Sequence, residues 1–235
     1  MIKDVPVTAI VAGRGGSKGL QGKNLADLGG RPLVAWSVAA AAESRYVDHI
    51  AVSSDDPDIL AAAGDAGNVV QIERPADLAT DTASIHDAII HALDVIDCFA
   101  GFVVLLQATS PLRTAGDIDA CIAAAAETHA PAVTVAPAAK PPQWMYRLGE
   151  NRSLSPFTQA EGGRRQEFET LYLLNGAVYV AETDWYRRNR TFIGDDTVGI
   201  VMPVERSVDI DSAFDLAVAR ALIHQTEEQT GCLMS

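Results

Sequence analysis

The sequence predicts an α/β fold built on a doubly wound, mostly parallel sheet. Over most of the 235 residues, short apolar runs typical of buried strands alternate with stretches that have helical spacing. The run over 102–106 is wholly apolar, as expected for a central parallel strand whose two faces are both covered. Polar or glycine-rich loops follow several of these runs, at the strand ends where such folds bind ligands.

The alternation predicts the elements in chain order. Strands are expected over 7–12, 49–52, 69–72, 102–106 and 132–136, and helices over 32–44, 57–66, 85–97 and 115–128. Pro32 suits the first turn of its helix, Asp56-Pro57 suits the start of the next, and Ser84 suits an N-cap. Because crossovers between parallel strands are right-handed, the loops 13–24, 74–84 and 107–113 are expected to line one crevice.

The regular alternation stops between residues 137 and 170, where Pro, Trp, Tyr and Arg follow no helical period. Long side chains such as Trp144, Met145 and Tyr146 predict a segment that packs against a partner subunit. A floppy insertion is the alternative interpretation. The pattern resumes with strands over 176–180 and 198–201, a short helix near Trp185 and a final helix over 212–229.

The composition excludes several classes of protein. The net charge of −13 repels nucleic-acid backbones, so no nucleic-acid partner is expected. No run of about 18 apolar residues occurs and the first residues lack a signal-peptide pattern, so no membrane partner is expected. The cysteines at 98, 121 and 232 have no CxxC spacing and indicate reduced thiols in the cytoplasm.

The loop after the first strand carries the main chemical signal. Five of the ten residues from Gly13 to Gly22 are glycine, and cations occur at intervals, as Arg14, Lys18 and Lys23. Glycine lets backbone N–H groups converge on an anion, and the cations add charge-assisted bonds. The spacing excludes a P-loop and a Gly-x-Gly-x-x-Gly fingerprint, because residues 17 and 18 are not glycine. The loop therefore predicts a polyphosphate cradle, with an incidental surface loop as the alternative.

A second signal is Asp209-Ile210-Asp211, just before the last predicted helix. In an extended segment, residues two apart point the same way, so both carboxylates are expected to reach one spot. Hard anionic oxygens are what Mg²⁺ takes from a protein when substrate phosphates supply the rest. The alternative is that Asp211 only caps the helix and Asp209 is solvated. With the cradle, the pair predicts a nucleotide, a divalent metal and phosphoryl or nucleotidyl transfer.

Together these motifs resemble the acylneuraminate (nonulosonate) cytidylyltransferases, of the CMP-sialic acid synthetase type. The matches occur in order along nearly the whole chain, at 10–25, 74–75, 78–84, 106–113, 165–166, 175–179 and 208–211. The resemblance implies a nucleotidyltransferase, Rossmann-like fold and transfer of CMP from CTP to the anomeric hydroxyl of a nine-carbon 2-keto sugar acid, releasing pyrophosphate. It also implies a cytoplasmic homodimer, with 1–235 as one cytidylyltransferase domain and 138–172 as a dimerisation and sugar-site insertion.

The resemblance further implies roles for individual residues. The catalytic residues implied are Arg14, Lys18, Lys23 and Asp211. The nucleotide-binding residues implied are Ala12, Gly13, Arg14, Gly15, Lys23, Asn24, Arg74, Ala83 and Ser84. The sugar-binding residues implied are Gln107, Asn175, Gly176, Tyr179 and Arg165, the last lent to the neighbouring subunit. The metal, Mg²⁺ or Mn²⁺, is implied on Asp209 and Asp211.

Two positions depart from the pattern of the sialic-acid enzymes. Residues 141–144 read Pro-Pro-Gln-Trp instead of His-Pro-x-Lys, and Leu173 stands where a basic residue often occurs. Losing two cations costs affinity for a carboxylated sugar unless another arginine substitutes, and the apolar side chains suit a legionaminic- or pseudaminic-type acid. The alternatives are a nucleotidyltransferase for another sugar acid or a sugar phosphate, and a catalytically silent nucleotide-binding homologue.

Overall fold

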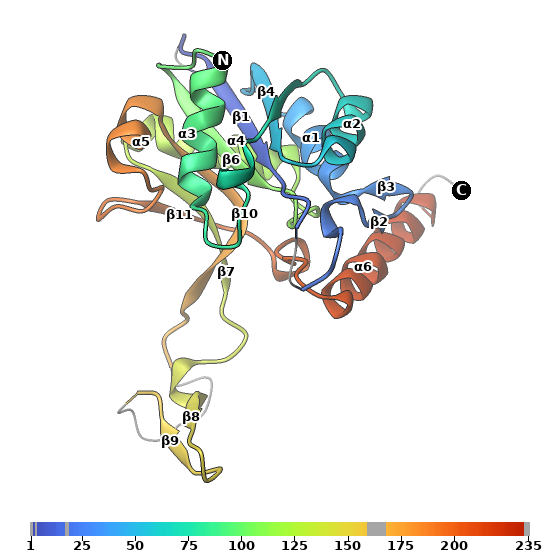
Figure 1. Ribbon diagram of the computed structural model, residues 1–235. Coiled ribbons are helices and arrows are strands. Elements are labelled where there is room, and N and C mark those ends of the chain that lie inside the picture. Colours follow the sequence, from blue (N-terminus) through green and yellow to red (C-terminus); the bar gives the residue numbers. More distant parts are fainter. Residues whose placement is uncertain (1, 3, 17–18, 159–167, 233–235) are drawn as a thin grey trace.

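A seven-stranded sheet forms the centre of the molecule (Figure 1). The computed structural model describes the chain except for residues 1, 3, 17–18, 159–167 and 233–235, with side chains as far as residue 225. In sheet order the strands are β11 (Val198–Val201), β7 (Ala132–Pro137), β10 (Tyr172–Glu182), β6 (Phe102–Gln107), β1 (Val7–Ala12), β4 (His49–Ser54) and β5 (Val70–Glu73). Strand β10 runs antiparallel to β6 and β7, and the other pairs are parallel. The predicted doubly wound, mostly parallel sheet is confirmed.

Successive residues of the central strands point to opposite faces of the sheet and so build two parts of the core. In β6, Val104 and Leu106 join the part covered by α1 (Leu33–Ala42), α2 (Pro57–Ala66) and α4 (Ala115–Thr128). Val103 and Leu105 join the part covered by α3 (Ile85–Val95) and α5 (Thr183–Asn189). Because β6 is buried on both faces, the wholly apolar run over 102–106 follows from its central place.

Side chains at the starts of the helices satisfy backbone N–H groups that have no partner within the helix. Ser84 accepts a hydrogen bond from the N–H of His86, which confirms it as the N-cap of α3. The prediction that Pro32 lies in the first turn of a helix is wrong. Pro32 has extended backbone and is the N-cap residue that precedes α1. In the described part of the chain, no helix is long and apolar enough to cross a bilayer.

A small hairpin and the last helix form a separate packing unit beside the main sheet. Strands β2 (Asp27–Leu28) and β3 (Arg31–Pro32) pair with each other, and α6 (Ala213–Cys232) lies against them (Figure 1). Leu28, Ile210 and Ile223 are buried together in this unit. The hairpin follows the short helix η1 (Lys23–Leu25), so this packing brings the start of α6 close to the end of the glycine-rich loop.

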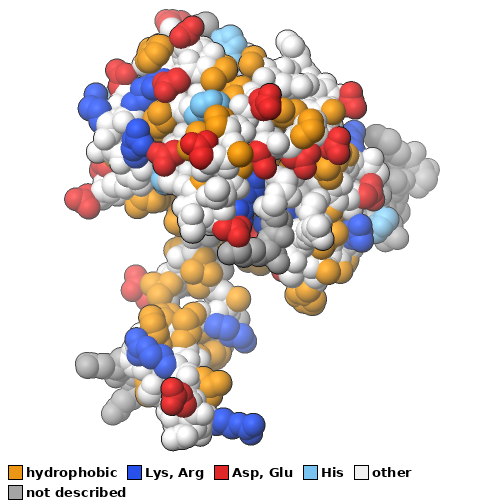
Figure 2. Space-filling view, in the orientation of Figure 1, with side chains coloured by type: hydrophobic (Ala, Val, Ile, Leu, Met, Phe, Trp, Pro, Cys, Tyr) orange, Lys and Arg blue, Asp and Glu red, His pale blue; other side chains and the backbone are white. Residues whose placement is uncertain are grey.

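Between β7 and β10 the chain leaves the body and forms an arm, seen at the bottom of Figure 1, whose described residues are 138–158 and 168–171. Its described part contains the short helix η3 (Pro142–Trp144) and a hairpin of β8 (Tyr146–Leu148) and β9 (Leu154–Pro156). Apolar side chains mixed with Lys and Arg gather along it in Figure 2. The large apolar residues exposed here are Trp144, Met145, Tyr146, Leu148, Leu154, Phe157 and Leu171.

Candidate active site

A cavity of about 250 Å³ opens at the carboxyl ends of β1 and β6, the edge of the sheet where α/β folds bind ligands. It is lined from both ends of the chain. The lining residues are Ala12, Gly13, Arg14, Lys23, Asn24, Arg74, Ile85, Gln107, Ala108, Thr109, Asp209 and Asp211. The structure therefore brings together both chemical signals of the sequence, the glycine loop (residues 13–22) and the acid loop (residues 207–211).

Asn24, just after the glycine loop, hydrogen-bonds to the start of the loop. Its side chain is 4% exposed, and Nδ2 donates a hydrogen bond of 2.8 Å to the carbonyl oxygen of Arg14. A Cβ placed on Gly13 would come within 3.2 Å of the same Nδ2 atom, so a side chain there would press on Asn24. The Oδ1 atom of Asn24 is buried and has no hydrogen-bond partner among the described residues. A buried acceptor without a partner is suited to a donor group of a ligand.

Two arginines connect the cavity to the loop that follows β5. Arg14 Nη1 lies 2.8 Å from Asp81 Oδ1, which joins the glycine loop to the 74–84 loop. Arg74 is 5% exposed and donates to Ser53 through Nε at 3.1 Å and through Nη2 at 2.7 Å. Burial lowers the pKa of Arg74. A buried cation held on the wall of a cavity is suited to an anionic or carbonyl oxygen.

The two carboxylates of the acid loop lie on the cavity, while Ile210 between them is buried in the small core with α6. This arrangement agrees with the alternation expected of an extended segment. The Ile210 N–H donates to the carbonyl oxygen of Thr109 at 2.8 Å, which fixes the loop to the end of β6. Ser212 Oγ accepts from the N–H of Asp215, and Asp215 accepts from the N–H of Ser212, so Ser212 and not Asp211 caps the start of α6.

Lys23 lies directly on the acid loop. Its Nζ atom is 2.7 Å from Asp211 Oδ1, and the two side chains are 17% and 73% exposed. Desolvation in the cavity raises the pKa of Asp209, and the nearby Asp211 adds to this, although a hydrogen bond from Thr109 opposes it. The ionised form of Asp209 is therefore disfavoured mainly by its burial.

The acid loop fits a divalent cation of the Mg²⁺ or Mn²⁺ type. Asp209 and Asp211 present hard carboxylate oxygens to one cavity. Burial, and to a smaller extent the neighbouring Asp211, raises the pKa of Asp209, and a bound cation would favour its ionised form. The described residues contain no cluster of three or more His, Cys, Asp or Glu that would hold a metal alone. Phosphate oxygens and water would have to complete the ligand set, as is usual for Mg²⁺.

Four of the residues predicted for the sugar acid are described, namely Gln107 at the end of β6 and Asn175, Gly176 and Tyr179 in β10. Pairing of β10 with β7 is interrupted between Leu174 and Tyr179, and the bulge carries Asn175 and Gly176. Gly176 has a φ of +74°, and a Cβ there would come within 2.9 Å of Gln107 Oε1. Burial raises the pKa of Tyr179. Of these residues only Gln107 lines the 250 Å³ cavity, whereas Asn175, Gly176 and Tyr179 do not.

Several predicted residues take other positions. Gly15, Ala83 and Ser84 do not line the cavity; Ile85, the first residue of α3, does. The Gly15 N–H donates to Asp55 Oδ1 at 3.1 Å. Lys18 and Arg165 lie outside the described residues. Thr109 and Asp81 were not singled out from the sequence, although both belong to loops that the strand-end argument had placed at the crevice.

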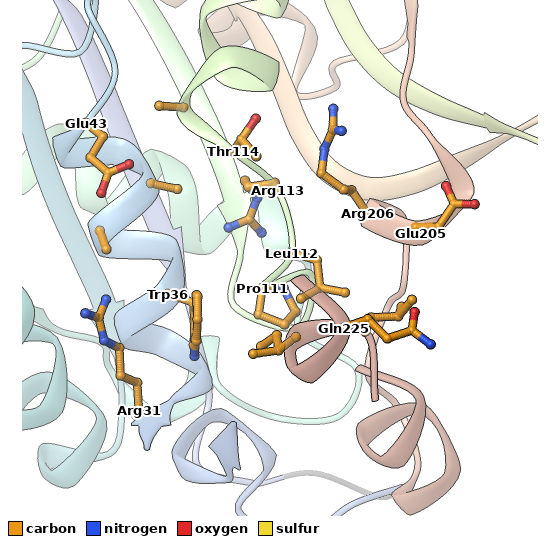
Figure 3. Close-up of a pocket in the computed structure, with 15 residues that line it drawn as sticks. Arg31, Trp36, Glu43, Pro111, Leu112, Arg113, Thr114, Glu205, Arg206 and Gln225 are labelled. Atoms are coloured by element: carbon orange, nitrogen blue, oxygen red, sulfur yellow. The ribbon is translucent and has the colours of Figure 1, made fainter. Parts of the chain in front are cut away.

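A larger cavity of about 580 Å³ lies between α1 and α6, behind the loop that follows β6 (Figure 3). Its walls are mainly apolar and include Trp36, Pro111 and Leu112. It contains neither the glycine loop nor the acid loop. Buried Arg113 lies on its wall and donates to the carbonyl oxygens of Ala177 and Gln107, which holds the end of β6 against β10. The smaller, polar cavity is therefore the candidate active site.

Comparisons with known proteins identify the family of the chain. Residues 8–152 match the family model described as cytidylyltransferase. A CMP-N,N'-diacetyllegionaminic acid synthase of Legionella pneumophila is 31% identical over 94% of this chain and 98% of its own length. An N-acylneuraminate cytidylyltransferase of Escherichia coli is 31% identical over 95% of this chain and 53% of its own length, so this chain spans about half of it.

The fold also resembles solved structures. The CTP complex of CMP:2-keto-3-deoxy-manno-octonic acid synthetase superposes with a TM-score of 0.71 at 17% identity, over 94% of this chain and 99% of that one. The 4-diphosphocytidyl-2C-methyl-D-erythritol synthase of Anaerococcus prevotii gives a TM-score of 0.64 at 12% identity, over 93% and 96%. These likenesses concern the fold. From the family match and the full-length relative together, the chain belongs to the cytidylyltransferase family.

Proposed function

We propose that this protein transfers CMP from CTP to the anomeric hydroxyl of a nine-carbon 2-keto sugar acid and releases pyrophosphate. The observation that carries the proposal is one cavity in which Arg14 and Lys23 face Asp209 and Asp211, in a chain of the cytidylyltransferase family. In the reaction the anomeric oxygen forms a bond to the α-phosphorus, the bond from that phosphorus to the bridging oxygen breaks, and the hydroxyl proton passes to solvent.

The cations of the cavity would bind and polarise the triphosphate. When CTP binds, the Lys23 ammonium would move from Asp211 to the α-phosphate and offset the negative charge that develops there. The Arg14 guanidinium would break its ion pair with Asp81 and bind the outer phosphates instead. Such positioning and charge stabilisation can supply most of the rate in phosphoryl and nucleotidyl transfer. Lys18 belongs to the same loop and is proposed to bind the triphosphate.

Other residues of the cavity, Asn24 and Arg74, would recognise the nucleoside. The unpartnered Asn24 Oδ1 would accept a hydrogen bond from a ribose hydroxyl, which would satisfy an otherwise orphaned buried oxygen. Buried Arg74, anchored on Ser53, would present its remaining donors to the cytosine, with the backbone around Ala83 and Ser84 framing the ring. The family resemblance implies a small base pocket here, which would exclude purines.

Asp209 and Asp211 would hold Mg²⁺ or Mn²⁺ together with phosphate oxygens of CTP. When bound, the ion supplies charge neutralisation at the α-phosphate and increases the acidity of a coordinated hydroxyl. The protein contributes the spacing of the two carboxylates, which Ile210 fixes by its burial and by its hydrogen bond to Thr109.

We propose a diacylamino acid of the legionaminic type as the preferred acceptor, with pseudaminic and sialic acids as the close alternatives. The exposed apolar Leu173 and Trp144, where sialic-acid enzymes tend to carry cations, support a less polar sugar. The similarity to a CMP-N,N'-diacetyllegionaminic acid synthase over nearly the full length of both chains supports the same class. Gln107, Gly176 and Tyr179 would contact the acceptor.

The test is release of pyrophosphate from CTP and Mg²⁺ with a panel of acceptors. Legionaminic-, pseudaminic- and sialic-type acids, an eight-carbon 2-keto acid and a sugar phosphate form the panel, with ATP, GTP and UTP as nucleotide controls. We expect turnover with CTP and the highest kcat/KM for a diacylamino nine-carbon acid. Turnover with the eight-carbon acid or the sugar phosphate alone would shift the acceptor class. CTP binding without turnover on any acceptor would favour a silent homologue.

We also propose that residues 138–172 form the dimerisation and sugar-site insertion, and that the protein acts as a homodimer in the cytoplasm. The exposed apolar surface of the arm supports a protein partner, and the free thiols Cys98 and Cys121 suit a reducing compartment. The paired change Leu148→Asp with Leu154→Asp should convert a dimer to a monomer in light scattering; a monomeric wild-type protein would contradict the proposal. Arg165 would be lent to the neighbouring site.

A further inference from the structure

Asn175 is buried in the bulge of β10, and all of its amide atoms have protein partners. The residue is 7% exposed. Oδ1 accepts from Thr134 Oγ1 at 2.7 Å and from the N–H of Ala177 at 3.2 Å. Nδ2 donates to Ser207 Oγ at 3.0 Å and to Met202 Sδ at 3.3 Å. Two acceptor and two donor positions are the full capacity of an amide side chain.

The orientation of this amide is fixed by its partners. A backbone N–H can only donate, so the atom that faces Ala177 must be the oxygen, and the nitrogen must face Ser207 and Met202. To bind a sugar directly, the amide would have to break at least one of these buried bonds, at a cost of about 1–3 kcal/mol. The side chain also does not line the cavity. Its position is therefore poorly suited to a ligand of the acceptor.

The same contacts connect the sheet to the acid loop. Thr134 belongs to β7 and Ser207 is the first residue of the acid loop, two residues before Asp209. Ser207 Oγ also donates to the carbonyl oxygen of Pro203 at 2.7 Å, so its orientation is set as well. The loop is thus attached to the sheet at Ser207 through Asn175 and at Ile210 through Thr109. Asp209 lies between these two attachments.

We propose that Asn175 is a positioning residue that sets the place of Asp209 through Ser207, instead of a residue that contacts the sugar acid. This inference rests on the proposed function, in which the two acids hold the divalent ion. Residues that hydrogen-bond a metal ligand typically change metal affinity or activity by about 10- to 100-fold when removed. Asn175 acts one step further away, through Ser207, so we expect an effect at the lower end of this range. The inference replaces the sequence-based role of Asn175 by one that does not involve the acceptor.

The decisive variant is Ser207→Ala, which removes the partner of Asn175 and leaves Asn175 itself unchanged. Binding of Mn²⁺ in the presence of CTP and without any sugar is measured by titration, alongside steady-state kinetics with the acceptor. We expect about tenfold weaker Mn²⁺ binding, a lower kcat and a sugar KM within twofold of wild type. Ser207→Thr keeps the hydroxyl and should recover most of the affinity. Thermal unfolding checks that each variant is folded.

Asn175→Ala and the double variant complete the test. If the two residues act through one bond, the double variant loses no more Mn²⁺ affinity than Asn175→Ala alone. A raised sugar KM in Asn175→Ala, with Ser207→Ala unchanged in both assays, would overturn the positioning role while the proposed function stands. If the wild-type protein neither binds Mn²⁺ in the presence of CTP nor shows turnover with any acceptor, the proposed function is wrong, and so is this inference.

Discussion

Gly19 is the point where the glycine loop touches the acid loop, and we expect Gly19→Ala to separate the two. A Cβ built on Gly19 overlaps the carbonyl oxygen of Asp211. That oxygen belongs to the main chain, so it cannot turn away as the end of a side chain would. To restore an ordinary contact of about 3.5 Å, one of the loops must move by roughly 1 Å.

The displacement acts on the contact that matters for the proposed chemistry. Lys23 Nζ lies 2.7 Å from Asp211 Oδ1. A shift of either loop would move this pair away from the position at which it is proposed to meet the triphosphate. A misplacement of about 1 Å in a reacting group can reduce the rate by about 100-fold. We therefore expect kcat with CTP and Mg²⁺ to fall by about 10- to 100-fold in Gly19→Ala, with a raised Mg²⁺ requirement.

Gly16→Ala is the matched control in the same loop. A Cβ on Gly16 meets no heavy atom within 4 Å, so the substitution has the same chemistry without the overlap. Both variants gain the same small reduction in unfolded-chain entropy. The assay is pyrophosphate release at saturating CTP and acceptor over a range of Mg²⁺ concentrations. If Gly19→Ala stays within threefold of Gly16→Ala, the contact between the loops does not control catalysis and the reasoning is wrong.

Other substitutions test the remaining contacts. Lys23→Met should lower kcat by more than tenfold, since its ammonium lies on the acid loop; an effect on KM alone would make Lys23 only a binding residue. Asp211→Asn should abolish turnover and leave the unfolding temperature nearly unchanged, because the side chain is 73% exposed; residual wild-type activity would remove its metal role. Burial alone would raise the pKa of Asp117, but hydrogen bonds from Arg206 and Thr114 outweigh it and hold that pKa below its usual range. The stabilisation is therefore present above the unfolded pKa of about 3.9 and is lost as the pH falls through the lower folded value. The Tm deficit of Asp117→Asn should shrink from pH 7 toward pH 3, and an equal deficit at both would contradict the ion pair.

The strands and the starts of the helices were the features most accessible to prediction. An apolar run such as 102–106 and a cap such as Ser84 are local signals, because burial on both faces and the need for an N-cap act over a few residues. Strand β10 was less accessible. Its direction and its extension to Tyr172–Glu182 depend on neighbours β6 and β7, and the exposed residues near its start carry no alternation.

The candidate site was predicted in outline because its two signals are short motifs at the ends of elements. The glycine loop follows β1 and the acid loop precedes α6. Because the carboxyl ends of parallel strands share one edge of the sheet, the glycine loop could be assigned to that edge from the sequence. Asn175 shows the limit of such reasoning. Its position in a motif suggested contact with the sugar, whereas its partners, Thr134, Met202 and Ser207, are distant in sequence and were not predictable from spacing.

By itself, then, the sequence determined the class of fold, the composition of the glycine loop and the presence of two acids two residues apart. These depend on periodicity, glycine content and residue type, which are local properties. Only the tertiary structure decided that Lys23 contacts Asp211 and that Gly19 lies against the carbonyl oxygen of Asp211. It also decided that the Asn175 amide bonds to Ser207 of the acid loop. Such contacts form when packing of α6 against the β2–β3 hairpin brings the two ends of the chain together, and no local pattern records which atoms then meet.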